Sequence, residues 1–285
     1  MVKQALPVAL FIAVLVSALA LAGVSISPAV TEILLPPGAS YTGEITVQNT
    51  SDESVVVEAV VRGFTSPKGV PILLDPSIDN YKYSGREVLT ITPNKQRIGP
   101  GESVVFNYTV TVPENLDPYG GRYAAAVFKV EPPSASEAQV VVTAQVASLF
   151  LLNPGGDAAP HFTFKDFRVW QDVGNPRLIH CDGLIINDGN VHADTEQMYG
   201  FMQITDRDGY IVGQMVWHPH TMLPDNSYRH EETWEAPDWL QSGTYYFYMT
   251  TIIYRPDGED PQLSLIHISE PTRLLSISYA VFCLK

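Results

Sequence analysis

The chain has 285 residues, and its 31 acidic side chains outnumber its 17 basic ones, which gives a formal net charge of -14. Such a charge repels phosphate backbones and anionic lipid surfaces, so it argues against nucleic acid as a partner. Since domains commonly hold about 100–150 residues, the length suits two domains with a hydrophobic core each.

An apolar segment near the start of the chain has the pattern of a secretion signal. Lys3 supplies a positive charge, residues 6–21 are almost entirely apolar, and Ala20 and Ala22 are the small residues that signal peptidase requires. We therefore predict a signal peptide over residues 1–22 and export of the rest. An uncleaved anchor is the alternative, because an apolar run of about 17 residues is near the lower limit for crossing a bilayer.

Residues 36–64 carry the clearest structural pattern in the chain. Hydrophobic and polar residues alternate along residues 44–48 and again along residues 55–61, on either side of a polar turn at residues 49–53. Alternation with a period of two indicates strands with one buried face. The short turn predicts that the two strands pair as an antiparallel hairpin.

The rest of the first half also has the pattern of short strands. Residues 64–85 interrupt it with a glycine- and proline-rich loop, which is a candidate binding feature with Tyr81 and Tyr83 available for partial burial. About seven strands with no amphipathic helix predict an immunoglobulin-like β-sandwich. The further strands are expected at residues 24–28, 31–35, 89–93, 104–112, 123–130 and 140–152.

A linker and a second series of strands follow. Residues 153–160 are rich in proline, glycine and alanine, as expected of a connection between domains. The predicted fold is therefore all-β, with two immunoglobulin-like β-sandwich domains in tandem after the signal peptide, at residues 24–152 and 161–262. In the second domain, strands are expected at residues 162–169, 184–191, 201–212 and 243–254, with a hairpin turn at residues 206–209.

The end of the chain has a different character. Residues 263–273 and 277–285 resemble a translated sequencing adapter, so we predict that residues 263–285 are a non-native tail. The second domain would then lack its final strand, which would leave a sheet edge open. Cys283 would also be foreign, and Cys181 alone cannot form an intramolecular disulfide.

Residues with reactive side chains are few. His218 and His220 share one face of an extended segment but supply only two ligands, so we expect no metal site. Cys181, beside His180, is expected to be a core cysteine rather than a nucleophile. Residues 206–209 resemble the start of a calcium loop without its later ligands. We expect no catalytic residues, no cofactor and no enzymatic activity.

Two asparagines match the acceptor pattern for N-glycosylation, because a hydroxyl residue follows each at the second position. They are Asn49, with Ser51, and Asn107, with Thr109. Asn107 falls within a predicted strand, which disfavours it as an acceptor.

Both domains carry short turn-and-strand signatures. In the first they are Pro36-Pro37-Gly38, residues 47–50, Pro100-Gly101-Glu102, Val112-Pro113 and residues 120–123. In the second they are residues 187–190, Asp208-Gly209, Leu223-Pro224 and residues 243–245. Through these signatures the chain resembles the WxL-interacting surface proteins of Gram-positive bacteria.

That resemblance implies a secreted, cell-wall-associated protein that is not an enzyme. It implies an adhesive role, in which loops and strand edges bind cell-wall polymer or a partner surface protein. A C-terminal membrane helix anchors such proteins, and here it would lie in the missing C-terminal segment. The candidate partner-binding residues, just before a predicted core strand, are Tyr119, Gly120, Gly121, Arg122 and Tyr123.

Residues 100–105 and 147–150 also resemble first-domain strands of the periplasmic pilus chaperones, which have two immunoglobulin-like domains. This more distant resemblance implies an alternative function, in which the protein assists assembly of surface or pilus subunits by strand complementation. Those chaperones hold a subunit's terminal carboxylate with two basic side chains. The comparable positions here are Thr31 or Glu32 and Ser148, and none is cationic.

Overall fold

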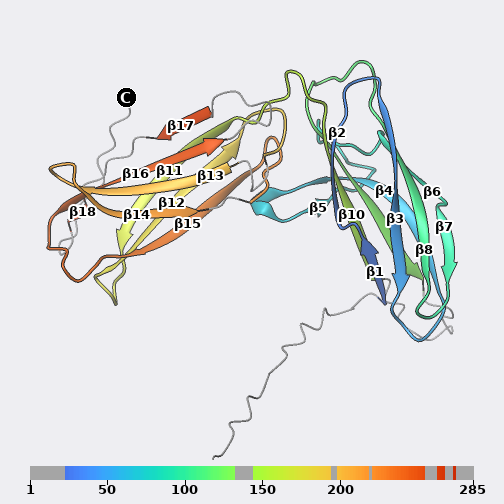
Figure 1. Cartoon of the computed structure of the whole chain (residues 1–285), viewed down its shortest axis with the longest axis horizontal. Helices are drawn as coiled ribbons and strands as arrows, with labels where there is room; N and C mark the ends of the chain where they lie inside the picture. The colour runs from blue at the N-terminus through green and yellow to red at the C-terminus, as the bar shows by residue number, and fades with distance from the viewer. Residues whose placement is uncertain are drawn as a thin grey trace, which may run out of the picture.

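The computed structural model describes residues 23–131, 144–193, 198–217, 220–253, 262–266 and 272–273. These residues form two immunoglobulin-like β-sandwiches in tandem, as predicted, and the one helical element among them is a short 3-10 turn, η1 (Pro67–Gly69) (Figure 1). No helix in this part of the chain is long and apolar enough to cross a membrane. The predicted signal peptide and residues 267–271 and 274–285 of the predicted tail lie outside the described residues.

The first sandwich encloses one core between two sheets. The first sheet runs in the order β1 (Val24–Ser27), β3 (Ser40–Asn49), β8 (Ser103–Thr111) and β6 (Leu89–Thr92). The second runs in the order β2 (Val30–Leu34), β10 (Ala144–Asn153), β9 (Arg122–Glu131), β4 (Val55–Thr65) and β5 (Ile72–Leu73), and β7 (Lys95–Ile98) also pairs with β4. Fully buried side chains from both sheets, such as Ile45, Val57, Phe106 and Phe128, fill the space between them.

The two strands with the clearest sequence pattern do not pair with each other. β3 pairs with β1 and β8, whereas β4 pairs with β9, β5 and β7, so the hairpin predicted for residues 36–64 is wrong. The turn between them carries the chain from one sheet to the other. Alternation shows only which face of a strand is buried, and Ile45 and Val57 face the same core from opposite sheets.

The chain also changes sheet between β1 and β2. β1 pairs antiparallel with β3, and β2 pairs parallel with β10 in the opposite sheet. The Ser148 hydroxyl donates to the Pro28 carbonyl (2.7 Å), and the Leu149 N–H donates to the Ala29 carbonyl (2.9 Å). These two contacts hold the crossing against the middle of β10.

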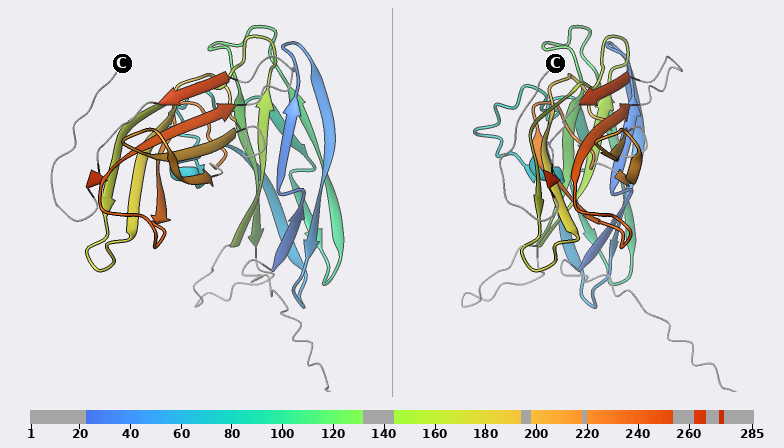
Figure 2. Two further views of the ribbon diagram at one scale, coloured as in Figure 1. Left: turned by 60° about the vertical axis from the view of Figure 1, so that its left-hand side comes forward. Right: turned by 90° about the vertical axis from the view of Figure 1, so that its left-hand side faces the viewer.

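The second sandwich has a three-stranded and a five-stranded sheet. The first has the order β11 (Phe162–Gln171), β12 (Leu178–Asn187) and β15 (Ser227–Glu235). The other has the order β14 (Ile211–Trp217), β13 (Met198–Asp206), β16 (Thr244–Ile253) and β17 (Gln262–Ile266), and β18 (Thr272–Arg273) also pairs with β16. Its core contains the fully buried side chains of Ile179, Ile185, Met202, Ile204 and Phe247. Figure 2 shows this group of strands beside the first sandwich from two further directions.

The hairpin predicted around residues 206–209 is confirmed, because β13 pairs with β14 across this turn. The Asp206 carboxylate accepts hydrogen bonds from the backbone N–H groups of Asp208 and Tyr210, each at 2.9 Å. Gly209 adopts a φ of +86°, which an L side chain rarely tolerates. A turn therefore accounts for the pattern that resembles a calcium loop.

The sequence did not predict β15. Its inward positions are Tyr228, His230, Glu232 and Trp234, all buried or half-buried. The imidazole and the carboxylate in the middle of this set interrupt the hydrophobic alternation by which strands are recognised. They satisfy each other, since His230 Nε2 lies 2.9 Å from a carboxylate oxygen of Glu232.

β17 covers the edge of β16, where the missing final strand was expected to leave the sheet open. Its residues pair antiparallel with residues 249–253, and β18 pairs with Thr244 and Tyr245. The expectation of an open edge is therefore not met. Strand pairing uses backbone groups, so a segment of unrelated sequence can fill this position. That the tail is non-native stays a prediction.

Candidate functional site

The predicted partner-binding segment, residues 119–123, lies where the two sandwiches meet. The Gly121 N–H donates to the Asn190 carbonyl of the second domain (2.8 Å). A Cβ on Gly120 would lie 2.2 Å from that same carbonyl oxygen, and Gly120 has a φ of +145°. Only glycine fits such a close approach of two backbones. A partner could reach these groups only by displacing the second domain.

Arg122 supports this glycine turn from within the first domain. Its side chain is buried, and Nη1 donates to the carbonyls of Gly120 (3.1 Å) and Gly121 (2.9 Å). Nη2 donates to the Pro118 carbonyl (2.9 Å). Burial lowers the pKa of Arg122, since desolvation disfavours the charged form. The guanidinium therefore holds the backbone of the turn that contacts the second domain.

The linker is held from both sides. The Tyr119 hydroxyl of the first domain donates to the Gly155 carbonyl (2.9 Å). From the second domain, Asn190 Oδ1 accepts the Ala159 N–H (2.8 Å) and Asn190 Nδ2 donates to the Asp157 carbonyl (3.2 Å). These contacts tie the connection to the same junction that residues 119–123 form.

Three polar side chains connect the domains through the centre of the junction. The buried Tyr123 hydroxyl accepts the backbone N–H of His192 (2.8 Å) and lies 3.2 Å from the buried His192 Nδ1. His192 Nε2 lies 2.8 Å from Glu32 Oε1 on β2. The geometry suits a neutral imidazole that accepts the Tyr123 proton at Nδ1 and donates its own from Nε2. The hydrogen bond from His192 lowers the pKa of Glu32, against an opposing effect of burial.

The loop that the sequence marked as a binding feature packs against the second domain. Tyr83 is buried in an apolar cluster that contains Phe64 and, from the second domain, Leu223. The Tyr81 hydroxyl donates to the Pro224 carbonyl (2.8 Å), and burial raises the pKa of Tyr81 far above its ordinary value. Tyr81 is partly buried, as predicted, whereas Tyr83 is buried more completely than predicted, and the loop serves contact within the chain.

By contrast, one edge of β10 is only partly covered. β9 pairs with β10 along residues 144–152, but β2 pairs with the other edge only from Leu149 onward. Residues 144–148 therefore have no strand partner on that edge among the described residues. Because the Leu149 N–H points to this edge and backbone directions alternate, Gln145 and Ala147 direct their N–H and C=O groups to the open side.

The two faces of this segment meet different surroundings. Ala144 and Val146 pack against the core of the first sandwich, whereas Ala147 and Leu149 belong to the apolar cluster at the domain junction. A cavity of about 300 Å³ lies on the junction side, with Leu149, Leu151 and Leu223 in its wall. A strand added beside β10 would direct alternate side chains to these two apolar surroundings.

No cation occupies the positions comparable to the carboxylate anchor of the pilus chaperones. Glu32 bonds to His192, and the buried Thr31 hydroxyl oxygen has no hydrogen-bond partner among the described residues. The Ser148 hydroxyl donates to the Pro28 carbonyl, between β1 and β2. A terminal carboxylate would meet the Glu32 carboxylate here, so anchoring of that kind does not fit these positions.

The reactive side chains named from the sequence remain apart. Cys181 is buried as predicted, and burial raises its pKa to about 12, which keeps the thiol protonated at neutral pH. His180 stacks on Trp170, and His218 lies outside the described residues while His220 is exposed. Among the described residues, no group of three or more side chains could hold a metal ion.

Asn49, which matches the N-glycosylation pattern, is not accessible as an acceptor. The side chain is fully buried, and Nδ2 donates to the carbonyls of Glu53 (2.7 Å), Ile98 (3.2 Å) and Gly99 (3.0 Å). This amide connects two turns at one end of the sandwich. Asn107 is exposed within β8.

Comparison with known proteins gives matches in structure alone. No family model and no curated protein matches the chain. The class 5 fimbriae chaperone CfaA matches with 16% identity over 85% of this chain and 98% of its own, at a TM-score of 0.45. The CupB2 chaperone of Pseudomonas aeruginosa matches with 12% identity over 82% and 96%, at 0.36, and the chaperone DraB of E. coli with 14% over 86% and 96%, at 0.37.

These three solved structures are chaperones, one of them a chaperone of fimbriae, and none is named as a WxL-interacting protein. At such low identities and TM-scores, the likeness carries no argument about function.

Proposed function

We propose that this protein is an exported, non-enzymatic, chaperone-like assembly factor that binds an extended segment of a surface or pilus subunit as an added strand on β10. The proposal is carried by the uncovered edge at residues 144–148. An extended peptide gains affinity there from backbone hydrogen bonds and selectivity from the surroundings of its alternate side chains.

The composition of this edge supports the proposal. Proteins usually protect exposed strand edges with charged residues, proline or bulges. Residues 144–148 contain no charged residue and no proline, whereas the edge strand β15 carries Arg229, Glu231 and Glu235 at exposed positions. An unprotected edge beside an apolar cavity suits a site that a partner strand covers.

The main interpretation from the sequence was binding of cell-wall polymer or a surface protein through loops. Two of the segments that suggested it, residues 75–85 and 119–123, are engaged by the second domain. Loop-mediated wall binding stays a prediction, as do adhesion and membrane anchoring. We place it second because these two segments are engaged within the chain.

A peptide titration tests the proposal. The probe is a short peptide of alternating valine and threonine with a lysine at each end, and the readout is the set of backbone amide NMR shifts. We expect saturable shifts centred on Gln145 and Ala147. Methylating alternate amide nitrogens of the peptide leaves one edge able to pair, so that version should still bind.

The fully N-methylated peptide is the control and should not bind, because both of its edges lack N–H donors. Equal binding of the fully methylated peptide would contradict strand addition. Shifts confined to loops on addition of isolated cell walls, with β10 unaffected, would favour the wall-binding function instead.

A further inference from the structure

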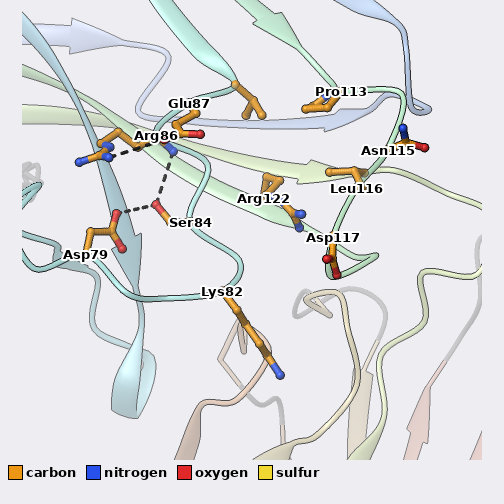
Figure 3. A pocket seen from close by; sticks show the side chains of 11 residues that line it. Asp79, Lys82, Ser84, Arg86, Glu87, Pro113, Asn115, Leu116, Asp117 and Arg122 are labelled. Carbon is orange, nitrogen blue, oxygen red and sulfur yellow. Dashed lines mark hydrogen bonds and ion pairs between the residues drawn. The ribbon is translucent and has the colours of Figure 1, made fainter.

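A second pocket, of about 290 Å³, lies in the first domain away from the β10 edge (Figure 3). Both signs of charge line its wall. The basic residues are Lys82, Arg86 and Arg122, and the acidic residues are Asp79, Glu87 and Asp117. The proposed strand addition uses none of these side chains.

Several of these charges are already paired. Lys82 lies 3.0 Å from Asp225 of the second domain, and in Figure 3 its side chain points away from the rest. Asp79 accepts the Ser84 hydroxyl at 2.6 Å. Arg86 donates to a backbone carbonyl at 2.7 Å. These groups shape the wall of the pocket more than they offer contacts within it.

Arg122 keeps one edge of its guanidinium unused. Backbone carbonyls take both hydrogens of Nη1 and one of Nη2, which leaves Nε–H and the second Nη2 hydrogen without partners among the described residues. The buried polar atoms that lack a partner in this part of the chain do not include Arg122 Nε, so this nitrogen reaches open space. With the same two nitrogens Arg168 grips both carboxylate oxygens of Asp182.

The wall of the pocket also contains two available carboxylates. Asp117 makes no hydrogen bond or ion pair among the described residues, and Figure 3 shows the guanidinium end of Arg122 turned toward it. Glu87 is mostly exposed, and its contact with Arg86 is a loose one of 3.8 Å. The pocket therefore combines a two-donor edge for a carboxylate with acceptors for a positive group.

We propose that this pocket binds a zwitterionic amino-acid group, with the carboxylate on the free edge of Arg122 and the ammonium beside Asp117. A ligand of zero net charge suits a pocket with both signs in a chain of net charge -14. A simple anion would be repelled by the two carboxylates, and a simple cation would leave the arginine edge unused. The volume suits one small moiety rather than a polymer chain.

Titration of the full chain with free alanine tests this site. We expect saturable NMR shifts at residues 115–122. N-acetylalanine lacks the ammonium and alanine amide lacks the carboxylate, so each should bind at least tenfold more weakly. Equal affinity for all three compounds, or no saturation by alanine at about 50 mM, would overturn the proposal.

A charge-removing variant gives a second test. Asp117→Asn should weaken alanine binding about tenfold and strengthen binding of N-acetylalanine, because it removes both the ammonium partner and a repulsive charge. Glu114→Gln, in the same loop but outside the pocket wall, is the matched control and should change neither. If Asp117→Asn binds alanine and N-acetylalanine as the unaltered protein does, the proposed zwitterion site is wrong.

Arg122→Lys keeps the charge and removes the two-donor edge, so alanine binding should be lost. Because Arg122 also supports the glycine turn, this variant is assessed only alongside its melting curve. If Arg122→Lys unfolds, the comparison of alanine, N-acetylalanine and alanine amide, together with Asp117→Asn, still tests the proposal. The test of the zwitterion pocket is independent of the test of strand addition, since the alanine titration and the peptide titration report on different residues.

Discussion

Two regions of the first domain differ from what their sequences suggest. The glycine turn at residues 119–123 looks like a binding loop but contacts the second domain, and the plain strand segment at residues 144–148 is the proposed binding surface. The turn has the glycines, tyrosines and arginine typical of a binding loop, yet most of its polar groups contact the second domain or its own backbone. The segment Ala144 to Ser148 has no distinctive side chain, yet one edge of its backbone has no strand partner among the described residues. Distinctive side chains here maintain the relation between domains, while the proposed binding surface is made of backbone.

Breaking the turn should have the largest effect. Gly120→Ala places a Cβ 2.2 Å from the Asn190 oxygen at a φ of +145°, so it should destabilise the protein by about 3 kcal/mol or more. Thermal or urea unfolding measures this. Gly101→Ala is the control, because Gly101 also has a positive φ (+70°) but nothing within 4 Å of its Cβ. An equal loss in the two variants would show that the contact with Asn190 is unimportant.

Removal of one hydroxyl at the junction should cost less. Tyr123→Phe leaves the His192 N–H without its acceptor in a buried place, which should reduce the free energy of unfolding by about 2 kcal/mol. Tyr119→Phe removes a single contact with the linker and should cost about 1 kcal/mol. Denaturant titration of both variants gives the comparison, and a smaller loss for Tyr123→Phe would refute a central role for this contact.

Blocking the open segment should affect binding more than stability. Ala147→Pro removes an N–H that faces the open edge, so peptide affinity should fall at least tenfold, about 1.4 kcal/mol, while the ladder with β9 remains. Ala147→Ser retains the N–H and should bind as the unaltered protein does. Titration with the valine–threonine peptide measures both, and full binding by the proline variant would rule out this edge.

The smallest expected effect is the pH response of Glu32. Its pKa in the folded protein is lowered from 4.5, so its contribution is present above that value and is lost as the pH falls through the lowered pKa. Because the carboxyl group is about half exposed, the contribution should be below about 1 kcal/mol. Melting curves between about pH 5 and pH 3 should show a larger loss for the unaltered protein than for Glu32→Gln. An equal loss of stability in the unaltered protein and in Glu32→Gln would argue against a contribution from Glu32.

Much of the local structure could be predicted from the order of residues. Val104 and the residues that follow it alternate cleanly and form β8, and the Asp206 to Gly209 turn forms the hairpin expected of it. The strand β15 was not predicted, because the polar residues His230 and Glu232 occupy inward positions and bond to each other there. Local patterns detect burial of apolar side chains, and they fail where polar pairs take the same places.

The candidate site could be predicted only in part. Residues 119–123 were named from the sequence as partner-binding candidates, but nothing in them shows that Asn190 and His192 lie opposite. No signal in residues 144–148 marks an open edge, because it depends on where β2 ends its pairing with β10.

By itself the sequence determined the all-β class, most strands and the buried face of each, because alternation and turn residues act over a few neighbouring positions. The tertiary structure alone decided that β3 and β4 lie in opposite sheets, that the glycine turn faces the second domain, and that β2 pairs with only part of β10. The physical reason is that backbone hydrogen bonds between strands are alike for nearly all residues, so the choice of partner depends on the packing of the whole chain.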